Sequence, residues 1–554
     1  DDRQVFAPVP EKRRDGCRSE KKKRLTYIYG RPTAGPERTT MKKKNLIPAV
    51  CLFLLASCGG PTVSQDEGNL ANRQGDLGNG QYINPILGGD YPDPTIMRDG
   101  DDYYMTHSCF DYLPGLVVFH SKDLVNWEPV SAALKTYLGS VWAPDITKYG
   151  DRYYIYFTVA LPDARKNYVV WADSPSGPWS DPIDLKIGNI DPCHAVGEDG
   201  TQWLFLSGGR RAKLTDDGLG VVPGTEEKVY EGWKYPSEWI TEGFSLEGPK
   251  LRKIGDYYYY LNAEGGTAGP PTSHMVVAAR SKSIDGPWEN SPYNPIIRTW
   301  KNSDRWWSKG HGTLIDTPEG DWYIVYHAYE NGYYNLGRQT LMEPVEWTED
   351  GWFRAKEGVD IERTIPKPIE AGAPVDRKSR LKDFRVGLDW KFYKDYDTTR
   401  FSVKDGVLTL QAKGDSPGTS SPLMCVAGAR AYEIEVEIEK TDDASAGLVM
   451  YYNDRFYAGT GFDSRNRLRF RQGIQRRAGT HDGGNHLWLK VRNEDQVLTG
   501  YYSYDGKNWI KEDWGLEISG YNHNTLYEFQ SMLPALYAAG EGEVKFRNFK
   551  YTQL

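Results

Sequence analysis

The sequence predicts an all-β protein, a five-bladed β-propeller followed by an antiparallel β-sandwich. Aromatic residues make up 13% of the 554-residue chain, and 58 glycines and 33 prolines supply frequent turns. No sustained helical periodicity interrupts this pattern. A turn followed by an aromatic-rich strand recurs about every fifty residues, a period typical of propeller blades. These strands begin at Asp102, Arg152, Gln202, Asp256 and Asp321.

Five ionisable side chains precede the first aromatic residue of these strands by eight to twelve residues: Asp93, Asp145, Asp191, Glu247 and His311. If the repeats superpose, all five lie at equivalent positions of the innermost strands and converge on one mouth of the central channel. Four carboxylates and one imidazole in a single cleft form a site suited to acid/base chemistry. The pattern therefore favours an enzyme.

A second domain is predicted after the repeats. The propeller is expected to span residues 82–364, and the Pro-, Ala- and Gly-rich stretch 365–378 is typical of a linker. Residues 379–554 show a different pattern, in which the segment 432–438 alternates strictly between apolar and polar residues. Together with an Asp-Gly hairpin signal at Asp505, this alternation predicts an antiparallel β-sandwich.

The N-terminal region has the form of a secretory signal. Residues 41–58 comprise a lysine-rich start, an apolar run and a Leu-Ala-Ser-Cys ending that resembles a bacterial lipobox. Cys58 is then the lipid-modified first residue of the mature protein. Residues 1–40 are interpreted as a non-native upstream extension, and 59–81 as a polar tether. We expect export to the bacterial cell envelope, in the periplasm or at the outer-membrane surface, with membrane contact only through the lipid on Cys58.

Composition narrows the classes of partner and cofactor. The formal net charge of −8 gives no basic excess of the kind that nucleic-acid binding requires. Cys109, Cys193 and Cys425 remain in the mature chain without CxxC spacing, which indicates neither a zinc site nor a disulfide scaffold. The sequence contains no phosphate-binding loop or dinucleotide fingerprint. We therefore expect no nucleic-acid partner and no cofactor required for catalysis.

Paired carboxylates facing each other across a channel suit the hydrolysis of glycosidic bonds. One carboxylic acid protonates the leaving oxygen, and one carboxylate activates water. For inversion of configuration the two stand about 6.5–9.5 Å apart, so that a water molecule fits between substrate and base. A third carboxylate nearby raises the pKa of the acid by like-charge repulsion and keeps it protonated near neutral pH.

Several ordered motifs resemble glycoside hydrolase family 43. Asp93 stands in a Pro-Asp-Pro motif, Asp145 in Trp-Ala-Pro-Asp, and Glu247 in Glu-Gly-Pro. The resemblance covers the whole predicted propeller through segments 84–87, 91–96, 141–146, 247–251, 310–313 and 337–339. The C-terminal region resembles the concanavalin-like domain that accompanies many β-xylosidase and α-L-arabinofuranosidase members.

The resemblance implies roles for the three carboxylates. Asp93 becomes the general base that activates water, Glu247 the general acid, and Asp145 the residue that tunes the pKa of the acid. Members of the family invert the configuration of the anomeric carbon.

The resemblance also implies contacts with the substrate. Arg338 matches an arginine that hydrogen-bonds sugar hydroxyls, and Asp191 lies in the third blade's counterpart of the Asp93 motif, without a firm chemical role. The predicted substrate-binding residues are Arg338, Trp142, Phe244, Asp191 and Phe110. His311 matches a channel histidine and is expected to be a structural residue that could contact a structural Ca²⁺ in the propeller channel.

The expected function is that of an inverting exo-glycosidase which removes terminal pentose residues, β-xylose or α-L-arabinofuranose, from oligosaccharides of plant polysaccharides. Two alternatives stay open at this point. One is a galactan- or galactofuranose-directed enzyme or an endo-arabinanase of the same family, and the other is a carbohydrate-binding propeller without turnover. A sandwich that reaches over the channel would favour exo action.

Overall fold

The structure of the protein is a computed structural model that describes residues 75–554. The predicted upstream extension, the signal segment with Cys58 and most of the tether lie outside the described residues. The described residues belong to one compact unit. No helix within residues 75–554 is both long enough and apolar enough to span a bilayer.

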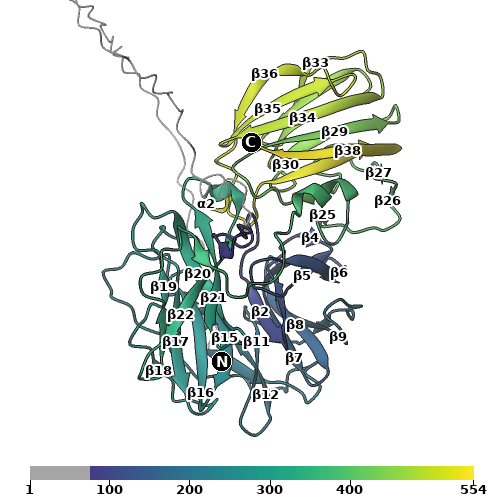
Figure 1. Cartoon of the computed structure of the whole chain (residues 1–554). Coiled ribbons are helices and arrows are strands. Elements are labelled where there is room, and N and C mark those ends of the chain that lie inside the picture. The colour runs from purple at the N-terminus through teal and green to yellow at the C-terminus, as the bar shows by residue number, and fades with distance from the viewer. Residues whose placement is uncertain (1–74) are drawn as a thin grey trace, which may run out of the picture. The chain divides into compact units, whose positions relative to one another are not determined.

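Five antiparallel sheets follow one another in chain order, as predicted for a five-bladed propeller (Figure 1). Successive strands within each blade are hydrogen-bonded neighbours, except that β19 pairs with β17. The blades comprise β2 (Thr95–Asp99), β3 (Asp102–Thr106), β5 (Gly115–Ser121) and β6 (Glu128–Leu134); β7 (Ser140–Tyr149), β8 (Arg152–Ala160), β9 (Arg165–Ala172) and β10 (Ile183–Asp184); β11 (Cys193–Val196), β12 (Gln202–Leu206), β13 (Arg210–Lys213) and β14 (Glu227–Lys228); β15 (Glu247–Ile254), β16 (Tyr257–Glu264), β17 (Met275–Ser281), β18 (Glu289–Asn290) and β19 (Ile297–Arg298); β20 (Trp306–Asp316), β21 (Trp322–Glu330), β22 (Gln339–Trp347) and β23 (Phe353–Ala355).

The aromatic repeats form the second strand of every blade, and their rings pack between neighbouring sheets. In β16, for example, Tyr260 is fully buried and its ring centroid lies 5.4 Å from that of Phe205 in β12 of the preceding blade. Trp127, at the outer turn of the first blade, is 1% exposed. These rings bury large apolar areas, which explains why the repeat is so regular in the sequence.

The ring of blades is closed by the segments that flank it. β1 (Gln81–Tyr82) pairs with β24 (Ile365–Pro366), and the ammonium group of Lys367 lies 2.7 Å from Asp76 and 2.9 Å from Asp123. All three charged side chains are at most 4% exposed. Part of the stretch expected to be tether and linker is therefore fixed to the propeller.

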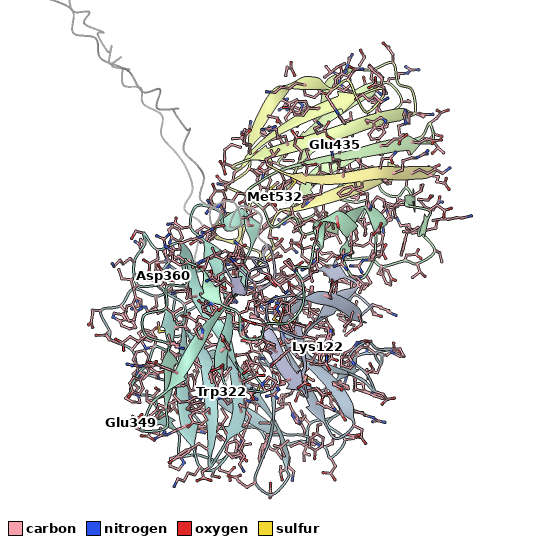
Figure 2. The ribbon with its side chains drawn as sticks, viewed as in Figure 1. Lys122, Trp322, Glu349, Asp360, Glu435 and Met532 are labelled. Atoms are coloured by element: carbon pink, nitrogen blue, oxygen red, sulfur yellow. The ribbon has the colours of Figure 1, made fainter. Side chains whose placement is uncertain are left out.

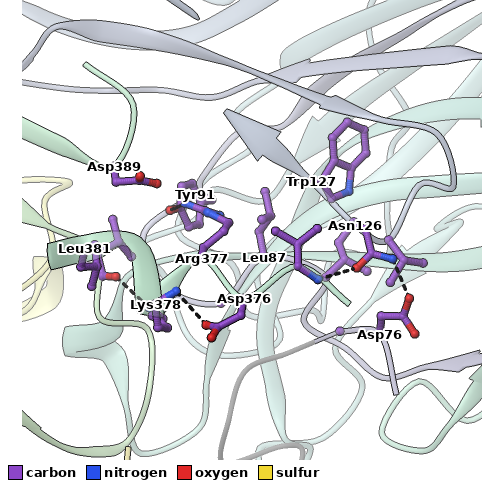
Figure 3. A pocket seen from close by; sticks show the side chains of 16 residues that line it. Asp76, Leu87, Tyr91, Asn126, Trp127, Asp376, Arg377, Lys378, Leu381 and Asp389 are labelled. Atoms are coloured by element: carbon purple, nitrogen blue, oxygen red, sulfur yellow. Dashed lines mark hydrogen bonds between the residues drawn. The ribbon is translucent and has the colours of Figure 1, made fainter. Parts of the chain in front are cut away.

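The following residues continue this attachment. The backbone N–H of Val375 donates to Asn126 Oδ1, and Asn126 in turn donates to Asp76 (Figure 3). Beyond them, the 3₁₀ helix η2 (Lys378–Asp383) leads into the second domain.

The C-terminal domain is a sandwich of two antiparallel sheets, as predicted. Its buried core lies between the sheets. The glutamates of β29 alternate with buried residues, and Glu435 (Figure 2) lies 2.9 Å from the ammonium group of Lys490 in the adjacent strand. One sheet contains β33 (Ile474–Thr480), β32 (Asn466–Arg471), β31 (Tyr457–Phe462), β30 (Ala444–Tyr451), β37 (Leu533–Gly540), β28 (Leu423–Cys425), β25 (Trp390–Tyr393) and β4 (Tyr112–Leu113); the other contains β26 (Phe401–Lys404), β27 (Val407–Gln411), β38 (Glu543–Gln553), β29 (Ala431–Lys440), β34 (His486–Glu494), β35 (Val497–Ser503) and β36 (Ile510–Glu517).

The edge strand β4 belongs in sequence to the first blade of the propeller. It pairs antiparallel with β25, so that Tyr112 lies opposite Tyr393 and Leu113 opposite Phe392. The first-blade loop is therefore part of the sandwich. The short helices η1 (Tyr334–Leu336) and α2 (His523–Leu526) lie in connections of the propeller and the sandwich, respectively.

Candidate active site

The predicted site residues of three blades share one local conformation. Asp93 and Asp191 each stand two residues before the first strand of a blade, and His311 lies within β20. Their φ angles are 54°, 57° and 54°, in the left-handed region that residues other than glycine rarely adopt. Such backbone strain persists where the surrounding structure enforces it and often marks a functional site. The same backbone conformation thus directs a polar side chain to the channel mouth in three of the blades.

Four of the five predicted ionisable residues line one cavity of about 70 Å³, which we call the acidic cavity. By the space that a water molecule requires, this volume holds about five to seven water-sized groups. The lining residues are Asp93, Phe110, Trp142, Ala143, Ile190, Asp191, Glu247, Thr267, His274, His311, Arg338 and Phe529.

Asp93 is held as an ionised carboxylate. Arg338 donates to it in a bidentate pair, with Nη1 2.8 Å from Oδ1 and Nη2 3.1 Å from Oδ2, and the hydroxyl of Ser108 donates at 2.6 Å. Burial alone would raise the pKa of Asp93, but the positive charge of Arg338 and hydrogen bonding within the site hold it well below its usual value. A carboxylate in this state accepts a proton only from a strongly activated donor.

Glu247 is in the opposite state. Burial raises the pKa of Glu247 well above its usual value, and the negative charges of Asp191 and Asp93 raise it further. The pKa of Asp191 is also raised, first by burial and then by the charge of Asp93. Asp191 is oriented by the backbone N–H of Gly248, which donates to its Oδ2 at 2.9 Å. The cavity therefore combines an ionised carboxylate with a protonated one.

Gly248 makes this arrangement sterically possible. Its φ is +57°, and a Cβ at this position would lie only 2.9 Å from the ring of His311. The Glu-Gly-Pro motif thus allows the backbone after the acid to pass close to the neighbouring blade.

The prediction that Asp145 lies beside Glu247 is wrong. Asp145 does not line the acidic cavity; it accepts hydrogen bonds from Lys250 at 2.9 Å and from the backbone N–H of His194 at 2.9 Å. It faces a separate cavity of about 250 Å³, further along the channel. The physical reason is a break in the β7–β8 register between Trp142 and Asp145, which puts Trp142 at the mouth instead.

A sequence signal separates the two aspartates. Asp93 and Asp191 are each followed by proline, whereas Asp145 is followed by isoleucine inside a continuous strand. Asp145 also precedes its aromatic strand by fewer residues than the others do. Among the predicted aspartates, a following proline therefore separates Asp93 and Asp191 from Asp145, although the dipeptide also occurs outside the site, at Asp181-Pro182.

The remaining predicted binding residues divide into two groups. Phe110, Trp142 and Arg338 line the acidic cavity, as expected of residues that contact a substrate. Phe244 does not: it is 43% exposed, and its ring stacks on Tyr235 at a centroid distance of 6.0 Å. It precedes β15 by three residues, and its side chain belongs to this separate aromatic surface.

His311 does not fit the expected calcium contact. Its Nδ1 lies 3.4 Å from Oδ1 of Asp93, a carboxylate already held by Arg338. Calcium requires six to eight oxygen ligands, whereas the other side chains next to His311 include the imidazole of His327. Among residues 75–554, no group of three or more His, Cys, Asp or Glu side chains is placed to hold a metal ion.

Five residues of the cavity lining were not predicted as site residues: Ala143, Ile190, Thr267, His274 and Phe529. His274 is buried, and neither of its ring nitrogens has a hydrogen-bond partner in the part of the chain that the structure describes. Its ring lines the cavity, and both of its nitrogens are shielded from solvent. Phe529 comes from the sandwich, and the guanidinium of Arg338 lies 5.2 Å from the centre of its ring. The propeller repeats could not predict Phe529, because it lies in the C-terminal domain, outside the repeated segments.

The first-blade loop holds Phe529 over the cavity. Gln530 donates to Asp111 Oδ2 at 2.8 Å, next to the β4–β25 pairing. The ring of Phe529 is stacked with that of Phe110 at a centroid distance of 6.5 Å and meets Trp142 edge-on at 5.6 Å. The sandwich therefore completes one wall of the acidic cavity.

A propeller with one ionised and one protonated carboxyl group in the same cavity has the acid/base pair that glycoside hydrolases use. The family model described as "Glycosyl hydrolases family 43" matches residues 82–353, and the model described as "Beta xylosidase C-terminal Concanavalin A-like domain" matches residues 382–552. The chain belongs to glycosyl hydrolase family 43, an inverting family.

Known proteins resemble the chain along most of its length. The non-reducing end α-L-arabinofuranosidase BoGH43B of Bacteroides ovatus is 32% identical, over 68% of this chain and 74% of that protein. A β-xylosidase of Bacillus subtilis is 28% identical, over 79% and 92% of the two chains. The crystal structure of the GH43 protein BlXynB of Bacillus licheniformis superposes with a TM-score of 0.77 at 29% identity, covering 86% of this chain and all of that one.

Substitutions of Asp191 and of Asp145 are expected to affect the pH dependence of the enzyme differently. Asp191→Asn removes a negative charge beside Glu247, so the pKa of Glu247 falls toward its usual value. We expect the basic limb of the kcat/KM profile to move by about one unit to lower pH. Asp145→Asn leaves the Lys250 ammonium without its anion and is expected to lower Tm without moving that limb. A shift in Asp145→Asn but not in Asp191→Asn would contradict this assignment.

Proposed function

We propose that the protein is an inverting exo-glycosidase that removes terminal pentose residues, β-xylose or α-L-arabinofuranose, from oligosaccharides of plant polysaccharides. The observation that carries the proposal is the acidic cavity itself. It is small, and it contains a carboxylate whose pKa is lowered together with a carboxyl group whose pKa is raised.

In the proposed reaction, Asp93 is the general base and Glu247 the general acid. Glu247 donates its proton to the glycosidic oxygen as the bond to the anomeric carbon breaks. A water molecule attacks that carbon from the opposite face and transfers a proton to Asp93. The products are the free sugar with inverted configuration and the shortened oligosaccharide. Solvent then returns a proton to Glu247 and removes one from Asp93.

Asp191 is the proposed modulator of the acid, in place of Asp145. Its charge is the first electrostatic contribution, after burial, to the raised pKa of Glu247. The backbone N–H of Gly248 and the hydroxyl of Ser207 orient its carboxylate. Arg338, which lines the cavity, is proposed to bind hydroxyls of the terminal sugar.

The shape of the site supports exo action on a pentose. A long polysaccharide would have to pass the wall formed by Phe529, which is unfavourable for an endo-arabinanase. The small volume favours a pentose, which has one carbon and one hydroxyl fewer than a hexose. The names of relatives, β-xylosidase and non-reducing end α-L-arabinofuranosidase, agree with this choice. The opposed pKa shifts favour turnover over binding alone.

The two catalytic assignments predict different leaving-group dependence. With aryl β-xylosides and aryl α-L-arabinofuranosides, Asp93→Asn should lower kcat about 10²–10⁴-fold for every aglycone, because the attacking water lacks its base. Glu247→Gln should show a similar loss with a disaccharide but a much smaller one with a dinitrophenyl glycoside. Dinitrophenolate leaves without protonation, so that substrate does not require the acid.

Three results decide between the open alternatives. Hydrolysis of a galactoside or galactofuranoside alone would move the proposal to that sugar. Endo cleavage of arabinan would contradict exo action. Unchanged kinetics in Asp93→Asn would contradict the proposed role of Asp93.

We also propose that the enzyme is exported and lipid-anchored in a bacterial envelope through Cys58. The support is the signal and lipobox pattern of residues 41–58. Expression of the full chain with a radiolabelled fatty acid should label the wild type and leave Cys58→Ala unlabelled. Equal labelling, or none in either protein, would contradict the anchor.

A further inference from the structure

We propose that a second cavity beside the acidic cavity binds the leaving-group part of the substrate as a neutral oligosaccharide of more than one sugar, with Tyr527 as a stacking platform. This inference rests on the proposed exo-glycosidase function. We call the second cavity the outer cavity. Trp142 and Phe529 line both cavities, so the two are neighbours across these rings.

The position of the outer cavity follows from the chemistry of the first. One sugar ring fills the acidic cavity, and the bond to be broken must lie within reach of Glu247, which lines that cavity. The rest of the substrate then continues beyond Trp142 and Phe529. The outer cavity measures about 870 Å³, against about 70 Å³ for the acidic cavity. Cavities of about 300–1,000 Å³ hold drug-sized ligands, so the space suits several sugars.

The lining of the outer cavity has the chemistry of a sugar site. Tyr137 and Tyr527 supply aromatic surface, and Glu242, Asn524 and Glu528 supply hydrogen-bonding groups. A sugar presents C–H groups on its ring faces and hydroxyls around its edge. Aromatic faces pack against the former, and carboxylates accept hydrogen bonds from the latter.

Tyr527 combines two features that folding does not explain. It is 91% exposed, so its ring buries almost no surface in the free protein. It also ends α2 in the left-handed conformation, with φ at 68°, a position that glycine or asparagine ordinarily occupies. A bulky side chain retained in a strained and exposed position is typical of a functional contact. Because Tyr527 lines the outer cavity, the leaving-group part of the substrate is assigned as the partner of its ring.

The charge of the lining favours neutral sugars. Asp111, Glu242 and Glu528 contribute carboxylates, whereas Arg165 contributes one guanidinium. That guanidinium donates to the backbone carbonyls at positions 161 and 164 and lies 4.7 Å from the ring centre of Trp142. An anionic sugar such as a uronic acid would meet like charges here.

The test compares substrates of increasing length in wild type, Tyr527→Gly and Tyr527→Phe. The series is xylobiose to xylotetraose or arabinobiose to arabinotetraose, according to the aryl glycoside that the wild type hydrolyses. We expect kcat/KM of the wild type to rise from the disaccharide to the tetrasaccharide. Tyr527→Gly should lower kcat/KM about three- to tenfold on the tetrasaccharide and much less on the disaccharide. Tyr527→Phe retains the ring and should retain the rise.

Thermal unfolding provides the folding control. Glycine suits the left-handed position, so Tyr527→Gly should unfold at a Tm no lower than that of the wild type. A kinetic loss confined to long substrates then reports a binding contact and not misfolding.

Other outcomes would overturn the inference. Equal kcat/KM on the disaccharide and tetrasaccharide in wild type, or an equal loss on all substrates in Tyr527→Gly, would exclude the platform while the proposed function stands. Failure of the wild type on every glycoside would overturn the proposed function as well. For the charge argument, a glucuronic acid branch on the leaving part should lower kcat/KM relative to the unbranched oligosaccharide, and equal values would contradict a neutral site.

Discussion

Two residues of the first-blade loop, Tyr112 and Leu113, add an edge strand to the sandwich. The wall that the sandwich contributes to the active site depends on that pairing. The same loop contributes Phe110 to the cavity and, through Asp111, holds the segment that contains Phe529. The aromatic wall restricts water in the cavity, and burial is the largest cause of the raised pKa of Glu247. The propeller supplies the carboxylates, and the sandwich helps to set the environment in which they differ.

The difference between the carboxylates comes from an imbalance of charge. Three carboxyl groups line the acidic cavity, whereas Arg338 is the one guanidinium among its lining residues and is bidentate on Asp93. The histidines do not supply a second cation, because burial lowers the pKa of His311 to about 3. Asp191 and Glu247 are therefore left with raised pKa values and Asp93 with a lowered one. This separation assigns base and acid to different residues of one small cavity.

The repeat made the fold and much of the site predictable. Asp93, Asp191, Glu247 and His311 could be located because blades place equivalent residues at one mouth. Asp145 was misplaced because a spacing rule does not register the bulge that shifts β7. Phe529 lies outside the repeats. Its place at the cavity depends on contacts between segments far apart in the sequence, the β4–β25 pairing and the hydrogen bond from Gln530 to Asp111. Phe244 had a plausible residue type but lies on a separate aromatic surface, and side-chain direction before a strand is not encoded in composition.

The protonation states of the resting enzyme test the account most directly. Carbon-13 NMR of protein labelled at the carboxyl carbons of Asp and Glu, assigned with Asp93→Asn and Glu247→Gln, would follow both groups through a pH titration. The account predicts that at pH 6 Glu247 is protonated while Asp93 is ionised, and that Asp93 stays ionised below the usual pKa of aspartate. An ionised Glu247 or a protonated Asp93 at pH 6 would contradict it.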